Sequence, residues 1–136
     1  MTRERLSIFL IGLVLCSCNS TPEPRPPRAL SDPHAILSLD NRGGYSHSGR
    51  LLDLLPDGMV VETRYSDVIG SEDKEAGRYR MTPNSITLTF PDRKPEILQK
   101  SIFEGTAYWT TAEGIQRILD PHDSYSRQIA LRSKNG

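Results

Sequence analysis

The sequence predicts a mainly β protein: a small antiparallel barrel or sandwich of six or seven strands with one short helix, after a signal peptide and a proline-rich tether. Three observations carry this prediction. An uncharged apolar run stands near the start, prolines cluster after it, and the rest of the chain alternates short apolar stretches with turn residues. We therefore divide the chain into a signal peptide (1–17), a linker (18–33) and a single β-rich domain (34–136), of a size that buries one core.

The start of the chain has the order of charged and apolar residues found in a secretory signal peptide. Arg3 and Arg5 supply positive charge, and residues 6–15 form an uncharged run only about half as long as a membrane-spanning helix. The residues Leu15-Cys16-Ser17-Cys18 then resemble the lipobox of bacterial lipoproteins, in which a leucine and a small residue precede the lipidated cysteine. Cys16 is the rival acceptor, but Leu15 before it is too bulky for the usual pattern.

The lipobox resemblance implies cleavage before Cys18 and attachment to a membrane through acyl chains, such as palmitate, on that cysteine. Two or more acyl chains give stable anchoring. Asn19 stands where an aspartate often marks inner-membrane retention, so the resemblance implies a place in the cell envelope at the outer membrane, facing the periplasm. Cleavage would leave Cys18 as the one cysteine, and the domain would then have neither a disulfide nor a thiolate metal site.

The segment that follows is a spacer by composition, with prolines at positions 22, 24, 26, 27 and 33. Proline-rich chains favour an extended conformation of roughly 3.1 Å per residue, so residues 19–33 would hold the domain on the order of 45 Å from the membrane. A recognition motif for a proline-binding partner is the alternative interpretation of the same residues.

The domain begins with a predicted hairpin. Residues 49–55 form its first strand, and Leu55-Pro56-Asp57-Gly58 forms the turn, because proline pre-sets φ, aspartate bonds its own backbone and glycine takes the left-handed position. Residues 59–65, rich in valine and threonine, return as the partner strand.

A second hairpin is expected after a polar loop at residues 66–76. In residues 77–81, Tyr79 and Met81 share one face of a strand, and Arg78 and Arg80 share the other. A turn at Thr82-Pro83-Asn84 leads into residues 85–90, where apolar and polar residues alternate. Such alternation is typical of a sheet with one buried and one solvent-exposed face. The side chains expected to point inward are Ile86, Leu88 and Phe90.

The last third of the domain mixes strands with a helix. Residues 96–104 and 106–110 form two strands around Gly105. Thr110 and Glu113 have the spacing of a capping box, and a short helix follows, with apolar residues at helical spacing and an end at Pro121. We expect residues 126–133 to be the final strand, with Ile129 and Leu131 on one face.

Two stretches share an order of turn and apolar residues with a known group of proteins: Gly49…Leu54-Leu55-Pro56-Asp57-Gly58…Gly77-Arg78-Tyr79…Ile86-Thr87-Leu88, and Tyr108-Trp109…Glu113-Gly114-Ile115…Ile118-Leu119. They resemble small bacterial lipoproteins with a lipocalin-like β domain, over about two-thirds of the chain. The resemblance implies a fold and a compartment, and it leaves the activity open.

Several groups of residues invite a chemical role, and each has a simpler interpretation. Ser46 lies in a stretch like the hydrolase elbow G-x-S-x-G, but Ser48 replaces the second glycine and no helix pattern follows. His34, His47 and His122 lack the spacing of metal ligands. The acidic residues 72–75 lack the order of a calcium loop, which favours an exposed charged loop.

Two further pairs could form binding surfaces. Arg78 and Arg80, with Arg64 nearby across the sheet, could receive an acidic partner. Tyr108 and Trp109 could line a pocket, although alternation in a strand turns at least one of them into the core.

The function expected from these features is that of a non-enzymatic accessory or interaction module, presented to another envelope protein. Its partners would be the membrane, through the lipid on Cys18, and that protein. Removal of Arg3, Glu4 and Arg5 leaves 15 basic and 16 acidic residues, a balance that argues against nucleic acid. We expect no cofactor, metal or catalytic residue. The alternative is a lipocalin-like carrier of a small apolar ligand, with an interior lined by Leu52, Leu54, Val61, Ile86, Leu88 and Trp109. An envelope hydrolase using Ser46 is a remote third option.

Overall fold

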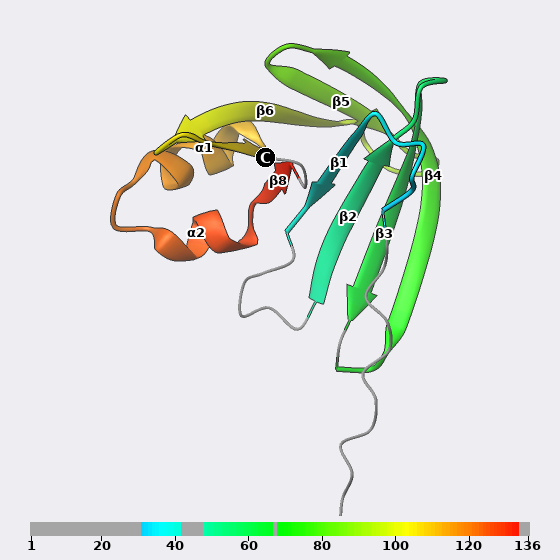
Figure 1. Ribbon diagram of the computed structural model, residues 1–136, viewed down its shortest axis with the longest axis horizontal. Helices are drawn as coiled ribbons and strands as arrows, with labels where there is room; N and C mark the ends of the chain where they lie inside the picture. The colour runs from blue at the N-terminus through cyan, green and yellow to red at the C-terminus, as the bar shows by residue number, and fades with distance from the viewer. Residues whose placement is uncertain (1–30, 42–47, 67, 134–136) are drawn as a thin grey trace, which may run out of the picture.

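The computed structural model describes residues 31–41, 48–66 and 68–133. Within these residues, eight antiparallel strands form a closed barrel, and two short helices lie on one side of it (Figure 1). In chain order the elements are β1 (Leu37–Asp40), β2 (Ser48–Leu54), β3 (Met59–Ser66), β4 (Ser71–Thr82), β5 (Ser85–Thr89), β6 (Glu96–Phe103), β7 (Thr106–Thr110), α1 (Ala112–Leu119), α2 (Ser124–Ile129) and β8 (Leu131–Ser133).

Each strand pairs with its neighbours in sequence, and β1 pairs with β8 to close the barrel. The predicted β2–β3 hairpin is confirmed, and its register joins Leu54 to Val60. Gly58 has a φ of 82°, and Asp57 accepts a hydrogen bond from the backbone N–H of Met59 at 3.0 Å, as the turn chemistry requires.

The core is the inner face of the barrel. Leu54 and Val60 face each other across the first hairpin, and Ile86 and Leu88 continue the same surface on β5. The predicted alternation of β5, with apolar residues inward, is therefore confirmed. One continuous cluster of buried side chains results: Leu39, Leu52, Leu54, Val60, Ile86, Leu88, Phe90, Leu98, Trp109 and Leu131.

A smaller apolar cluster lies outside the barrel, where α1 covers β6 and β7. It contains Tyr108, Ile118 and Ala130, with Phe103 packed against them. Arg127 of α2 lies 4.1 Å from the centre of the Phe103 ring and donates to the backbone oxygen of Ile118 at 3.1 Å. Since the last carbonyls of a helix lack partners within it, Arg127 stabilises the end of α1.

The mainly β class and the antiparallel barrel are confirmed, whereas the element count differs from the prediction. Eight strands and two helices lie within the described residues, in place of six or seven strands and one helix. The additional strand is β1, and the predicted polar loop at 66–76 is wrong because residues 71–76 pair with β3 along their whole length.

The C-terminal prediction is also corrected. Residues 124–129 form α2 instead of the first part of a long final strand, because Asp123 caps this helix. Its carboxylate accepts hydrogen bonds from the backbone N–H and the hydroxyl of Ser126, at 2.9 and 2.7 Å. The first helix begins after Thr111, one residue later than the predicted capping box, and the Thr111 side chain makes no capping hydrogen bond.

The predicted signal peptide, Cys18 and most of the linker lie outside the described residues. In the part of the chain that the structure describes, no helix is long and apolar enough to span a bilayer.

Candidate functional site

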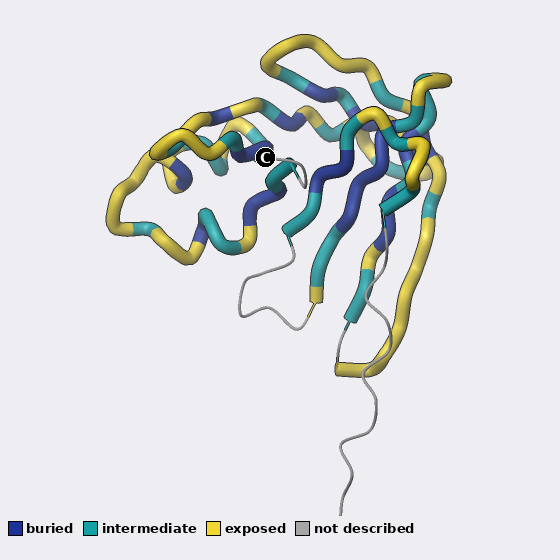
Figure 2. The backbone as a smooth tube through the Cα atoms, in the orientation of Figure 1, coloured by how far each residue is buried: buried dark blue, intermediate teal, exposed yellow. Residues whose placement is uncertain are grey.

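Three strands extend beyond the closed part of the barrel. β1 pairs with β2 only along Leu51–Leu54, and β5 pairs with β4 only along Arg78–Thr82, whereas the β3–β4 pairing continues to Ser66 and Ser71. We refer to the extended part, residues 48–50, 62–66 and 68–76, as the arm. Figure 1 shows it projecting from the barrel, and Figure 2 shows that β4 is exposed along most of its length.

Glu62 lies buried at the base of the arm. Its side chain is 1% exposed and points to the inner face of the sheet, in phase with Val60 and opposite Leu52. Arg50 donates to Glu62 from Nε, and its two terminal nitrogens form a two-pronged contact with Glu96 at 2.9 and 2.7 Å. Such a paired geometry is stronger than a single charged hydrogen bond.

Glu62, Arg50 and Glu96 form a charged cluster, the buried cluster, which Arg93 completes from the loop between β5 and β6. Arg93 donates to Glu62, contacts Glu75 at 2.6 Å, and places its guanidinium 4.0 Å from the centre of the Phe90 ring. Its Nε is buried and has no hydrogen-bond partner among the described atoms. Arg64 adds a longer contact to Glu62 at 3.3 Å. The cluster therefore ties the β5–β6 loop to β3 and β4 of the arm.

These contacts shift the charge equilibria in the cluster. Burial alone would raise the pKa of Glu62, but the hydrogen bond from Arg93 and the charge of Arg50 outweigh it, so the pKa lies below its usual value. Burial alone would lower the pKa of Arg50, and the hydrogen bond and charge of Glu96 outweigh it and raise the pKa. The contacts therefore favour the charged forms of Glu62 and Arg50, and this ion pair holds the base of the arm in one arrangement.

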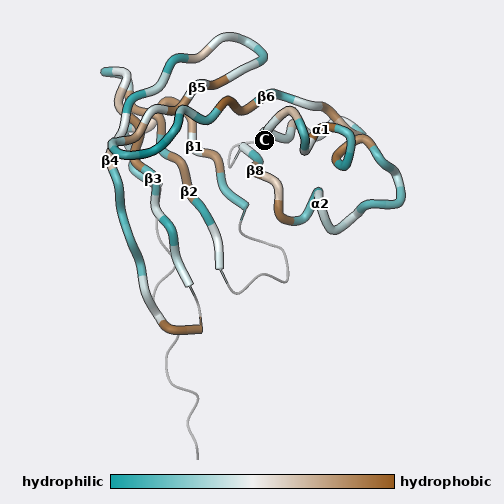
Figure 3. Tube along the Cα trace, turned by 180° about the vertical axis from the view of Figure 1, so that it is seen from behind, coloured by the Kyte–Doolittle hydropathy of each residue, from teal (hydrophilic) through white to brown (hydrophobic). Residues whose placement is uncertain are grey.

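The arm ends in an exposed apolar tip. Val68 and Ile69 are 71% and 75% exposed, and Gly70 beside them has a φ of 61°. Figure 3 shows this apolar tip between hydrophilic strand ends. Behind it, β4 carries charged residues at positions 72–75, with Lys74 paired to Glu72 at 3.2 Å. Residues 72–74 are exposed, as predicted, whereas Glu75 is half-buried, and all four belong to a strand and not to a loop.

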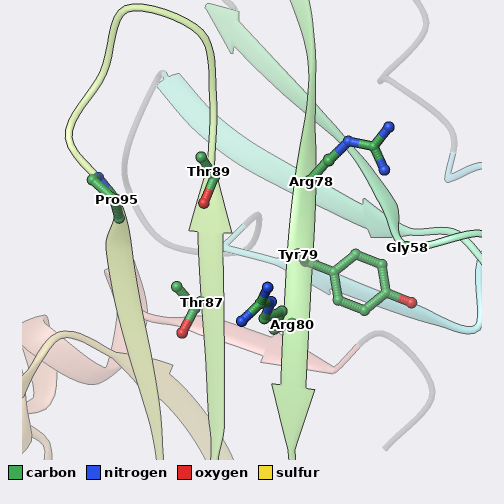
Figure 4. Close-up of a pocket in the computed structure, with 7 residues that line it drawn as sticks. All are labelled: Gly58, Arg78, Tyr79, Arg80, Thr87, Thr89 and Pro95. Atoms are coloured by element: carbon green, nitrogen blue, oxygen red, sulfur yellow. The ribbon is translucent and has the colours of Figure 1, made fainter.

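A second surface lies on the outer face of β4 and β5. Arg78 and Arg80 border an open groove of about 460 Å³ whose other walls include Thr87, Thr89 and Pro95. In Figure 4, the Arg80 side chain lies beside Thr87, and the Arg78 side chain extends away from Thr89. The prediction that Arg64 lies near Arg78 and Arg80 is wrong. Arg64 stands opposite Asp73 in the β3–β4 register, on the arm, and its side chain contacts Glu62 of the buried cluster.

The remaining candidates are separated from one another. Ser46 and His47 lie outside the described residues, and His34 and His122 lie in turns at opposite ends of the described chain. Tyr108 and Trp109 are both buried, on opposite faces of β7, so core packing accounts for both. Val61 is on the outer face opposite Asp53, away from the other residues predicted to line the interior.

Sequence reasoning missed the buried cluster. Its members come from β2, β3, β4, β6 and a loop, and the signal that could have revealed it is a charged Glu62 at an inward position of an apolar strand. Within the described residues, no group of three histidine, cysteine or acidic side chains is placed to bind a metal ion. Comparisons with protein-family models, curated proteins and solved structures return no match for this chain.

Proposed function

We propose that this protein is a membrane-anchored, non-enzymatic interaction module of the cell envelope. In this proposal the lipid on Cys18 holds it to the outer membrane, and the arm binds another envelope protein. The observation that carries the proposal is the exposed pair Val68 and Ile69 at the end of a braced extension of the sheet. Complete burial of one such side chain contributes roughly 1.5–3 kcal/mol, so a partner that covers the tip gains affinity directly.

The bracing supports a binding role because a preorganised surface loses little conformational freedom on association. Glu62, Arg50 and Arg93 fix the base of the arm, and β3 pairs with both of its neighbours along the arm. On the edge of β4 that faces away from β3, residues 71–76 have no strand partner within the described chain. Such an edge can accept a strand from a partner, and its charged residues oppose pairing with a second copy of the same strand.

The tip residues are expected to decide partner capture. Replacing both, Val68→Ser and Ile69→Ser, removes the apolar contact while leaving the core and the buried cluster unchanged. We expect cross-linking in intact cells to recover at least about ten-fold less of the protein enriched by the wild-type chain, since the variant loses apolar burial equivalent to more than one power of ten in affinity.

The matched control removes exposed isoleucines elsewhere. Ile97→Ser and Ile102→Ser on β6 are both more than half exposed and lie off the arm. This variant should capture the partner as the wild type does. Equal losses in both variants, or full capture by the tip variant, would contradict the role of the arm.

The anchor has a separate test. The mature protein, extracted gently from membranes, is expected to have the mass of residues 18–136 plus acyl groups, and Cys18→Ser should shift the chain from the membrane fraction to the soluble fraction. Loss of acyl mass and membrane association together would support the anchor. An unmodified chain in the wild-type membrane fraction would remove this part of the proposal without affecting the test of the arm.

A further inference from the structure

The outer face that carries Arg78 and Arg80 has positive charge without an internal counter-charge. Both side chains are exposed, and within the described residues neither takes part in an ion pair or a side-chain hydrogen bond. The other arginines on β2, β3 and the β5–β6 loop have acidic partners in the buried cluster. Arg78 and Arg80 are therefore available to an anion from outside the molecule.

The register places this face beside the point where the N-terminal segment reaches the barrel. The backbone N–H of Asp32 donates to Asp53 at 3.0 Å, and the backbone N–H of Ile36 donates to the oxygen of Leu54 at 2.8 Å. Asp53 lies opposite Val61, and Val61 lies opposite Ala76, all on the outer face of the sheet. Arg78 follows two positions along β4, so it is roughly 12 Å from Asp53 by the usual strand spacings.

The length of chain before the barrel limits how far this end of the domain can lie from the membrane. The end-to-end distance from Cys18 to Ser31 is at most about 45 Å when the chain is fully extended, and it is shorter in any other conformation. The arm lies at the opposite end of the strands, since the β2–β3 turn at 55–58 and the tip at 68–70 are the two ends of β3. The Arg78–Arg80 face therefore lies at the same end of the strands as the tether, and the tip lies at the other end.

We infer that the Arg78–Arg80 face binds the anionic phosphate headgroups of the membrane in which Cys18 is anchored. This inference rests on the proposed anchor and deepens it, because it assigns an orientation: the arginine face lies on the bilayer and the arm points away, toward a protein partner. Anionic lipid surfaces attract arginine side chains, and Thr89 and Thr87 add hydroxyl donors beside Arg78 and Arg80. Charge complementarity requires an anionic occupant, and the nearby tether favours a lipid surface over an acidic protein segment.

The test uses the unacylated mature chain, residues 18–136 with Cys18→Ser, so that only the protein surface can bind. Its partitioning onto vesicles containing phosphatidylglycerol is compared with that onto phosphatidylcholine vesicles, by sedimentation at low salt. We expect binding to the anionic vesicles alone, decreasing with salt. Arg78→Gln with Arg80→Gln should lower the partition coefficient about thirty-fold.

The control loses two positive charges away from the arginine face, by Lys100→Gln on β6 with Arg117→Gln on α1. It should bind almost as the wild type does. An equal loss in the control, or no wild-type binding to anionic vesicles, would overturn the inference. A poly-glutamate peptide that binds in an Arg78- and Arg80-dependent manner, while vesicles do not, would also overturn it and assign the face to an acidic protein. Because this chain carries no lipid, a failure here is distinct from a failure of acylation at Cys18.

Discussion

Replacing Leu88 with alanine is expected to lower the free energy of unfolding by about 3 kcal/mol, because the truncation leaves a cavity in a closed interior. Leu88 is fully buried and belongs to the same cluster as Leu52, Ile86 and Trp109. These side chains pack against one another from several strands, so no neighbour can move far to fill the space. The measurement is urea unfolding of the mature chain, followed by the fluorescence of Trp109, the one tryptophan of the sequence.

This measurement also separates the proposed interaction module from a lipocalin-like carrier, the alternative that the sequence left open. A carrier of a small apolar ligand requires interior space, and in an open cavity the Leu88 side chain would lose few contacts on truncation. A loss below about 1 kcal/mol would therefore favour the carrier and contradict a packed interior. Ile97→Ala serves as the control, because Ile97 is exposed on the outer face of β6 and should change the stability by less than about 1 kcal/mol.

Replacing Glu62 with glutamine is expected to lower the free energy of unfolding by about 3 kcal/mol, since it removes the buried charge that Arg50 and Arg93 share. Arg93 would keep Glu75 as its one acidic partner, and Arg50 would keep Glu96. The cost should be accompanied by faster hydrogen exchange in residues 62–66 and 71–76, because the cluster fixes the base of the arm. Urea unfolding and mass-resolved exchange measure the two effects on one sample.

The loss of stability at acid pH is a second measurement of the contribution of Glu62. The pKa of Glu62 is lower in the folded protein, so its contribution is complete above the unfolded value of about 4.3 and is lost as the pH falls through the folded value. The wild type should lose stability in that acid range more steeply than Glu62→Gln. As the matched control, Glu72→Gln removes an exposed acid paired only with Lys74 and should cost less than about 1 kcal/mol. Similar costs for Glu62 and Glu72 would contradict the role of the cluster.

The parts of the fold predicted from the sequence are those whose signals are local. The Leu55-Pro56-Asp57-Gly58 turn determines its hairpin by its own backbone chemistry, and the alternation in residues 85–90 determines which face of β5 is buried. Residues 71–76 were predicted as a loop because charged residues are rare in strands. Their conformation comes instead from pairing with β3, a contact between segments that propensity does not record. Tertiary pairing outweighed composition there.

The candidate sites differ in the same way, between those with a local sequence signal and those formed by distant segments. The shared face of Arg78 and Arg80 could be predicted, because period-two alternation within one strand is a local property. The buried cluster could not, since Arg50, Glu62 and Arg93 meet only after β2, β3 and the β5–β6 loop are assembled. Residues 126–129 were predicted as part of a strand over 126–133 because Ile129 and Leu131 would share one face, although Asp123 with Ser126 is a capping signal that could have indicated α2.

The pairing of β1 with β8 has a consequence for how the molecule is made. Every other strand pair joins neighbours in sequence, with α1 and α2 lying between β7 and β8, whereas this pair joins the first and last strands of the described chain. Contacts between distant segments form late because their loop-closure entropy is large. Under the proposed anchor, a chain exported N-terminus first would therefore receive its lipid while the barrel is still open. Folding would finish only after Ser133 of β8 had left the translocation channel, so the native molecule would be completed on the membrane that already held it.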